Sequence, residues 1–576
     1  MPVPRREWRV DSRPAGGHHP IMSRTPIRPE LKIFLAMFLI GFAFVACTQR
    51  AWEDYWITFR ISRNLATGHG LVYTPGEHLH CFTSPLGVLL PAGLSWLTGN
   101  GSEELVLWLF RIVSLVALAA GVAVLYSFLK PLIQRPVVIG LTLALVALDA
   151  KTLDFSTNGM ETGLLIFFLS LTLHGFFVAG PKRVLRLGVG WAGLMWTRPD
   201  SCVYIAALGL GALLFLRRGP AGNAAEDWRT KLLRAGLICA ALYLPWFLWA
   251  WWYYGSPVPH TIVAKGTNQP PLAVAALAGD FLSLPFRSFL SANASIWWTF
   301  MPSYSWLQTW HYLPTAVFAL ASWAAALAWL CPLCRPSTRL LSFCVYVSHF
   351  YLSDVVRTFF PWYLPAVAFQ GYVTLGLLFD QLLGLAERFP QLNWNRGWFR
   401  HAPVILYGVA LVFVVFESGL TVCVARQAEV QQRLIEDGVR RPIGLWLRAH
   451  AASSQDTVFL EALGYIGYFS GLKMLDYPGL SSQEVVAARR RLGPQRENQV
   501  YLELKPDWLV LRPPDVAGNW LIDSSRLMEF YDLAAVMDAG DRINAVRWLP
   551  GRINLQADQK YFIFHRKPVA KPKPSK

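Results

Sequence analysis

Long apolar runs alternate with short basic segments between residues 33 and 424. In lipid, each such run must satisfy its backbone hydrogen bonds internally, and a helix does so within one segment. The composition agrees, because 54% of the residues are hydrophobic and only 15% are charged, a balance that is unusual for a water-soluble chain of this length. The sequence therefore predicts a mainly α fold, built as a polytopic membrane helical bundle.

The basic residues predict the orientation of this bundle. Lys and Arg are enriched in the cytoplasmic loops of membrane proteins, which explains the formal charge of +17 without a nucleic-acid partner. Placing each basic segment inside gives about 11 transmembrane helices, a cytoplasmic N-terminus and an outer C-terminus. The run from Leu86 to Leu97 contains Pro91 and is shorter than the roughly 20 residues that a crossing needs. We expect a re-entrant or juxtamembrane helix there.

Composition also divides the chain. Residues 1–31 are rich in Arg, Pro and Gly and are predicted to form a disordered cytoplasmic tail. Residues 32–425 contain the apolar runs, with the first outer loop at 49–98. Short β-rich runs then alternate with helical ones over residues 426–566, which predicts an extracytoplasmic α/β domain. The Lys- and Pro-rich residues 567–576 are predicted to be a second disordered tail.

The first outer loop carries the most distinctive polar pattern. It reads WEDYWITFRISRNLATGHGLVYTPGEHLHCFTSP over residues 52–85 and opens with two adjacent carboxylates, Glu53 and Asp54. The predicted topology places three further polar segments on the same face: TNGMET (157–162), TRPD (197–200) and YYGSPVPHTIVAK (253–265). Ionisable residues at the ends of membrane spans are costly there and are candidates for function. These segments therefore predict one shared site.

These residue types suit the transfer of a sugar from a lipid phosphate. A carboxylate can take the proton of an attacking hydroxyl, which is worth typically about 10² to 10⁴ in rate, and Asp54 is our candidate base, with Glu53 beside it. Cations can bind the phosphate and stabilise its developing charge. The candidates for that role are Arg198, Lys265, Arg357 and His260. The candidate substrate-binding residues are Trp56, Arg60, Glu161, Asp200, Trp362 and Tyr363.

Simpler structural explanations stay open for several of these residues. An acidic residue before an amphipathic run can cap the helix, Arg198 and Asp200 can pair with each other, and Lys265 can extend along apolar surface towards the headgroups. The histidines show no metal-ligand spacing. We therefore expect no cofactor, with a divalent metal as the alternative.

The same segments resemble those of the GT-C superfamily of polyprenyl-phosphate-sugar-dependent glycosyltransferases. Within it they are most similar to the mycobacterial terminal β-(1→2)-arabinofuranosyltransferases and their bacterial relatives. The likeness is carried by the first outer loop, by NGMET (158–162), TRPD (197–200) and YYGSPVPHTIVAK (253–265), and by GYIGYFSGLKMLDYPGL (464–480). It implies a GT-C-type fold in the bacterial inner membrane and an inverting sugar transfer on the extracytoplasmic side. The catalytic acid pair of the family falls on Glu53 and Asp54.

The chain departs from the family pattern at a few positions. Glu53 replaces the more usual Asp, which gives Asp54 more weight as the base, and His260 replaces an Asn. Because of these departures, the transferred sugar can be arabinofuranose, another pentose or a hexose. The expected partners are a polyprenyl-phosphate sugar donor, the lipid bilayer and an acceptor that is a glycan, a lipid or a protein. The competing hypothesis is a transporter or flippase of lipid-linked sugars, which would require ionisable residues near the bilayer midplane and broken helices in related halves.

Overall fold

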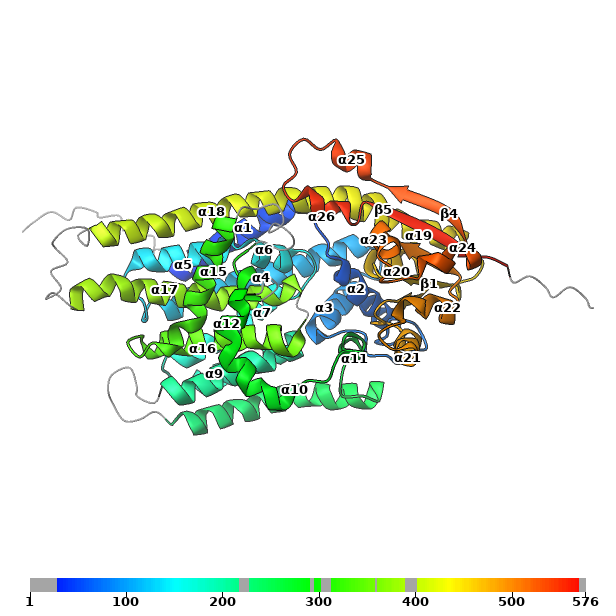
Figure 1. Ribbon diagram of the computed structural model, residues 1–576. Coiled ribbons are helices and arrows are strands. Elements are labelled where there is room, and N and C mark those ends of the chain that lie inside the picture. Colours follow the sequence, from blue (N-terminus) through cyan, green and yellow to red (C-terminus); the bar gives the residue numbers. More distant parts are fainter. Residues whose placement is uncertain are drawn as a thin grey trace, which may run out of the picture.

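The computed structural model describes residues 28–216, 227–290, 295–301, 312–357, 360–388 and 401–568. Residues 1–27 and 569–576 of the two predicted tails lie outside these ranges. Most of the described chain is helical, and a five-stranded sheet lies near the C-terminus. The helices of the bundle run side by side, and the domain that contains the sheet sits at one end of them (Figure 1). The prediction of a mainly α membrane bundle with a C-terminal α/β domain is confirmed.

Each apolar run that was expected to cross the membrane forms a helix. These helices are α1 (Pro29–Thr48), α4 (Glu103–Leu129), α5 (Pro136–Leu148), α7 (Thr162–Phe177), α8 (Arg183–Thr197), α9 (Cys202–Phe215), α10 (Trp228–Tyr254), α15 (Tyr312–Leu327), α16 (Pro336–Phe350), α17 (Leu364–Arg388) and α18 (Ala402–Gln431). Among the described residues, five helices are long and apolar enough to span a membrane, or six if α5 and the helix after it form one bent span. The chain is thus a membrane protein, and the count of about 11 crossings stays a prediction.

Shorter elements connect the bundle helices. They are α2 (Glu53–Ala66), α3 (Pro85–Leu97), α6 (Ala150–Thr157), η1 (Pro199–Ser201), α11 (His260–Gly266), η2 (Val274–Ala276), α12 (Leu277–Leu290), α13 (Ser295–Trp298), η3 (Ala328–Leu330), η4 (Tyr351–Val356) and η5 (Pro361–Tyr363). Helix α3 has 13 residues, contains Pro91 and exposes Trp96 and Leu97 at its end. It is too short to cross a bilayer as a straight helix.

A buried polar cluster fixes the 49° bend between α5 and α6. Asp149 lies at the bend and caps α6 with its side chain. Lys151 donates a hydrogen bond to the carbonyl oxygen of Met301 at 2.5 Å and lies 3.4 Å from Asp149, while Tyr372 donates to Glu417 at 3.1 Å. Because these polar groups bind one another, the cluster stabilises the bend. Both of its carboxylates, Asp149 and Glu417, have partners, unlike the carboxylates in the open sites of transporters.

The C-terminal domain follows α18 without a break in the helix. Its helical elements are η8 (Gln432–Arg440), α19 (Arg441–His450), α20 (Gly464–Ser470), α21 (Gln483–Leu492), η9 (Glu497–Gln499), α22 (Val500–Leu504), α23 (Pro513–Ala517), η10 (Ser524–Arg526), α24 (Leu527–Phe530), α25 (Gly540–Asn544) and α26 (Arg552–Gln556). Its strands are β1 (Thr457–Leu460), β2 (Lys473–Asp476), β3 (Trp508–Leu511), β4 (Tyr531–Asp538) and β5 (Lys560–Arg566). The strand order is β2-β1-β3-β5-β4, with β1 parallel to β2 and β3, and β5 antiparallel to β3 and β4.

The first outer loop and the C-terminal domain share one hydrophobic core. Ile61 and Tyr73 of the loop pack in the same buried cluster as Val439, Ile466 and Val510 of the domain. A separate cluster fills the membrane bundle. Burial of apolar surface is the main driving force for packing, so the loop that carries Glu53 and Asp54 is held by the domain as well as by the bundle.

The predicted orientation can be tested by labelling single cysteines. A chain whose only cysteine is Ser454→Cys, exposed in the C-terminal domain, should react with an impermeant maleimide added to intact spheroplasts. A chain that keeps only the native Cys331, exposed after η3, should react only after permeabilisation, because its segment is expected to be cytoplasmic. Labelling of Cys331 alone would reverse the topology.

Candidate functional site

Asp54 lies in the first turn of α2, where the bundle meets the C-terminal domain (Figure 1). The backbone N–H of Trp52 donates to the carbonyl oxygen of Asn158 at 2.7 Å, which ties this turn to the loop after α6. The Asp54 carboxylate is half-buried, and it accepts no side-chain hydrogen bond and forms no ion pair within the described ranges. Burial raises the pKa of Asp54 above its ordinary value, and Lys265 and Arg198 partly oppose that shift. This carboxylate is therefore available to accept a proton.

Lys265 supplies a cation near Asp54. It lies in the last turn of α11, and its Nζ is 4.8 Å from the centre of the Phe360 ring. The desolvated surroundings lower the pKa of Lys265, while attraction to Asp54 raises it. No carboxylate lies within ion-pair distance of its Nζ among the residues with a described position. The ammonium group can thus bind an anion that enters the site.

Arg198 is already neutralised by two acids. It follows α8, and its Nε lies 3.1 Å from Asp200 while its Nη1 lies 3.4 Å from Glu161. The guanidinium also covers the ring of Tyr363 at 4.5 Å. The ion pair between Arg198 and Asp200, which the sequence offered as an alternative to phosphate binding, is present, and Glu161 is a second partner of Arg198. Because buried charges require such partners, Arg198 connects three sequence segments at the site.

Aromatic rings form a wall beside these charged groups. Trp362 stacks on Phe360 at 4.6 Å between ring centres and lies 5.8 Å from Trp52, which in turn packs edge-on against Phe155. Trp362 and Tyr363 are half-buried, so each presents part of its ring outside the protein core. The site therefore combines an apolar wall with a carboxylate and an ammonium group that have no ion-pair partner in the described part of the chain.

The NGMET segment fits closely against α2. Gly159 has φ +95°, a conformation that favours glycine, and a Cβ there would lie 2.6 Å from the ring of Tyr55. The segment then places Glu161 as the N-cap residue of α7. The motif is thus explained by close packing at Gly159 and by the contact of Glu161 with Arg198.

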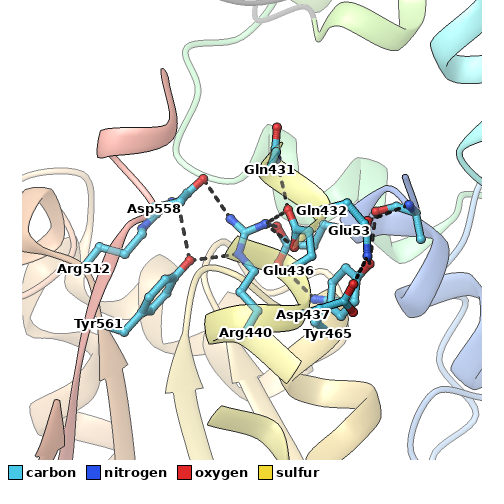
Figure 2. Close-up of polar contacts among 12 residues, drawn as sticks. Glu53, Gln431, Gln432, Glu436, Asp437, Arg440, Tyr465, Arg512, Asp558 and Tyr561 are labelled. Carbon is cyan, nitrogen blue, oxygen red and sulfur yellow. Dashed lines mark hydrogen bonds and ion pairs between the residues drawn. The ribbon is translucent and has the colours of Figure 1, made fainter. Parts of the chain in front are cut away.

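Glu53 points away from Asp54 and into the C-terminal domain. Its Oε1 accepts a hydrogen bond from the N–H of Gly464 at 3.2 Å, and its Oε2 lies 3.3 Å from Arg440. Figure 2 shows the Arg440 guanidinium between Glu53 and Glu436 on one side and Asp558 on the other. Burial raises the pKa of Glu53 to about 8 against the attraction of Arg440. The two adjacent acids therefore have different surroundings, because consecutive helical residues point about 100° apart.

Two predicted substrate residues of α2 are also turned towards the C-terminal domain. Trp56 is buried among the rings of Tyr465, Tyr468 and Phe469, with ring centres 4.8 to 5.2 Å away. Arg60 donates to the carbonyl oxygens at the end of α20, at 2.7 Å to Gly467 and 2.9 Å to Leu472. In this structure both side chains join α2 to α20.

Two predicted phosphate-binding residues lie apart from Asp54. The His260 N–H donates to the carbonyl oxygen of His80 at 2.9 Å, and its ring is half-buried beside the backbone of Gly479 and Ser482. Arg357 is exposed and donates to the carbonyl oxygen of Pro270 at 2.9 Å. The structure therefore groups Asp54, Glu161, Arg198, Asp200, Lys265, Trp362 and Tyr363, and it places Glu53, Trp56, Arg60, His260 and Arg357 elsewhere.

Several buried arginines that support the site were not predicted. Arg111 of α4 donates to the carbonyl oxygens of Gln49 and Arg50 at 2.8 and 2.6 Å, and so holds the turn before α2. Arg50 pairs with Asp154 of α6 at 2.9 Å. A charged residue inside an apolar run, as Arg111 is, was the available signal. Arg440 of the C-terminal domain had no comparable signal, because charged residues are common in that part of the chain.

Possible metal ligands are not clustered at the site. Within the described residues, no group of three or more His, Cys, Asp or Glu side chains is arranged to hold a metal ion.

Sequence comparison finds related proteins with a named activity. The chain is 30% identical over 263 residues to a terminal β-(1→2)-arabinofuranosyltransferase of Corynebacterium glutamicum, and 30% identical over 238 residues to the protein of that name in Mycobacterium tuberculosis. The matched regions cover 41% and 38% of this chain but only 36% and 35% of the relatives. The resemblance indicated by the motifs is confirmed over this part of the chain. A family described as a domain of unknown function, DUF8728, matches residues 425–563.

One solved structure has a similar overall fold. The apo crystal structure of ArnT from Cupriavidus metallidurans matches with a TM-score of 0.51 at 13% identity, covering 93% of this chain and 97% of ArnT. The structure of the same protein bound to undecaprenyl phosphate matches with a TM-score of 0.48 at 12% identity, with the same coverage. The chain is thus similar in fold to apo ArnT and similar in sequence to the two arabinofuranosyltransferases.

The contact between α2 and α20 gives a test of how the site is held. A Cβ at Gly464 would lie 2.0 Å from the backbone oxygen of Glu53, so Gly464→Ala should push α20 away from α2 and lower the melting temperature of the purified protein by several degrees. Gly419→Ala is a matched control for the loss of a helical glycine, because Gly419 lies within α18 and has open space around it. An equal loss in both variants would show that the contact with Glu53 does not cause the effect.

Proposed function

We propose that the protein is an inverting glycosyltransferase of the bacterial inner membrane, which transfers a sugar from a polyprenyl-phosphate donor to an extracytoplasmic acceptor. The observation that carries this proposal is the Asp54 carboxylate, which is half-buried, has no ion-pair partner among the described residues and lies near enough to the Lys265 ammonium group for the two charges to interact. The ArnT-like fold and the named relatives support it.

The proposed reaction needs a base on one side of the sugar and an anion site on the other. A hydroxyl oxygen of the acceptor attacks the anomeric carbon of the donor sugar, and its proton passes to the Asp54 carboxylate. The bond between the anomeric carbon and the phosphate oxygen breaks, and its electron pair leaves with the polyprenyl phosphate. Lys265 stabilises the negative charge that the phosphate gains. Attack from the face opposite the phosphate inverts the configuration of the anomeric carbon.

The surrounding residues support donor binding in this proposal. The half-buried rings of Trp362 and Tyr363 offer apolar surface for the sugar or for the first prenyl units. Arg198 keeps Glu161 and Asp200 in place through its ion pairs, so it orders the candidate site more than it supplies net charge. The name of the two relatives supports arabinofuranose as the transferred sugar.

The role of Asp54 predicts a large effect of a small substitution. Asp54→Asn keeps the size of the side chain but removes the basic lone pair, so transfer should fall by at least about 10²-fold. Expression and thermal stability should stay near those of the unchanged protein, because Asp54 makes no side-chain hydrogen bond or ion pair to described residues. The measurement is transfer of radiolabelled sugar from a polyprenyl-phosphate donor by purified protein.

Glu53→Gln is the matched control for this experiment. It leaves an amide that still accepts from Gly464, so it should reduce transfer less than Asp54→Asn does. If Asp54→Asn retained activity while Glu53→Gln lost it, Glu53 would be the base. Activity in both variants would contradict the proposed mechanism.

Lys265 predicts a linked change in donor affinity and pH dependence. Lys265→Ala should raise KM for the donor more than it lowers kcat, because a contact made already in the ground state appears mainly in KM. Lys265 also lowers the pKa of Asp54. The base must be unprotonated to act. Removing this cation should therefore raise the pKa of Asp54 and move the acidic limb of the plot of kcat/KM against pH to higher pH.

Lys265→Arg separates charge from shape in this test. It keeps the positive charge, so the acidic limb should stay in place even if KM changes. An acidic limb that did not move in Lys265→Ala would show that Asp54 is not the group that titrates, and an unchanged KM would remove Lys265 from the phosphate site.

A further inference from the structure

Helix α11, which carries Lys265, is too short to hold its own conformation. It has seven residues, from His260 to Gly266, whereas isolated helices below about 12 residues are marginal in water. Ile262 is exposed. Its neighbours in the chain, Pro259 and Thr267, have extended backbone. Contacts from outside the helix must therefore fix the position of Lys265.

Arg489 of the C-terminal domain provides these contacts. Its Nη1 donates to the carbonyl oxygen of Ala264 at 2.8 Å, and its Nη2 donates to that of Thr267 at 3.2 Å. The side chain of Asn268 donates back to the carbonyl oxygen of Arg489 at 3.0 Å. These bonds lie on both sides of Lys265 in the chain. A cation at the C-terminal end of a helix is also favourable for the unpaired carbonyl groups there.

Arg489 is itself rigidly held. It is 5% exposed, pairs with Glu497 at 3.2 Å and donates to the carbonyl oxygen of Pro478 at 2.9 Å. Its guanidinium covers the ring of Tyr477 at 4.9 Å. Figure 1 shows α11 beside α21, the helix that carries Arg489. The end of α11 is thus attached to the C-terminal domain and not to the membrane helix that precedes it in the chain.

The same domain also holds the helix that carries Asp54. Arg440 and the N–H of Gly464 bind Glu53, the residue before Asp54. Arg60, further along α2, binds the end of α20. Both short helices of the candidate site are therefore attached to one body.

We propose that Arg489 is a positioning residue for Lys265, and that the C-terminal domain sets the separation between the Lys265 ammonium group and the Asp54 carboxylate. The inference rests on the proposed function and gives a role to the region that matches a domain of unknown function. Arg489 lies outside the pocket and acts through the Ala264–Lys265 peptide. Its loss should therefore weaken binding of the donor phosphate and leave proton transfer to Asp54 largely unchanged.

A double-mutant cycle tests this inference. Arg489→Ala should raise KM for the donor about tenfold and change kcat by less than about threefold, because the affected contact is made in the ground state. If Arg489 acts only through Lys265, Arg489→Ala combined with Lys265→Ala should have no larger effect than Lys265→Ala alone. The Kd of polyprenyl phosphate, followed by intrinsic tryptophan fluorescence in detergent, should rise in parallel with KM.

Arg491→Ala is the control within the same helix. Arg491 is exposed and pairs with Glu503 inside the C-terminal domain, so KM and Kd should not change. If Arg489→Ala does not reach the membrane, Asn268→Ala removes the two hydrogen bonds that Asn268 donates to the carbonyl oxygen of Arg489 and to Glu497. It leaves the bonds donated by Arg489 in place, so it should raise Kd by a smaller factor.

Two results would overturn the inference. The first is an unchanged Kd for polyprenyl phosphate in both Arg489→Ala and Asn268→Ala. The second is a double variant whose increase in KM equals the product of the increases in Arg489→Ala and Lys265→Ala, because the two residues would then act independently. Absence of polyprenyl-phosphate binding and of transfer in the unchanged protein would instead refute the proposed function, and this inference with it.

Discussion

The arrangement of the candidate site depends on one buried cation, the guanidinium of Arg440. It pairs with Glu53 from the first outer loop, and with Glu436 and Asp558 from the C-terminal domain. A guanidinium stripped of water is stable only where its charge and its N–H groups have partners. Further docking contacts between α2 and the domain are the N–H of Gly464, which also binds Glu53, and the hydrogen bonds from Arg60 to Gly467 and Leu472. Without Glu53, the cluster loses its only contribution from the membrane part of the chain among the described contacts.

This interaction explains why adjacent acids can serve different purposes. Residues 53 and 54 are separated by about 100° around the helix axis, so one points into the docking contact and the other towards Lys265 and Arg198. The pKa values of both are raised by burial, yet only Glu53 has hydrogen-bonded partners in the described structure. The docking contact and the candidate base therefore rest on consecutive residues that have different partners.

The sequence predicted the helices well because hydrophobic length is a strong local signal. Every expected span forms a helix, and Asp54, Glu161, Arg198 and Lys265, one from each of the four polar segments, lie near one another. The sequence did not predict that Trp56 and Arg60 face the C-terminal domain, or that His260 packs beside Ser482, because these contacts join segments far apart in the chain. Strand β4 has a weak signal in the sequence, because it is largely exposed and lacks a buried apolar run. Arg489 was unremarkable within its basic helix, and only the docking of α11 shows its role.

The shared core has a practical consequence for how this protein can be divided. A family boundary near residue 425 invites expression of the C-terminal part as an independent fragment. Such a fragment would keep Val439, Ile466 and Val510 but lose the apolar side chains of the first outer loop that cover them, such as Ile61 and Tyr73. It would also lose Glu53 as a partner of Arg440. Exposed apolar patches of this kind promote association, so a fragment designed for solution work needs residues 52–88 joined to it as a second segment, as a discontinuous unit.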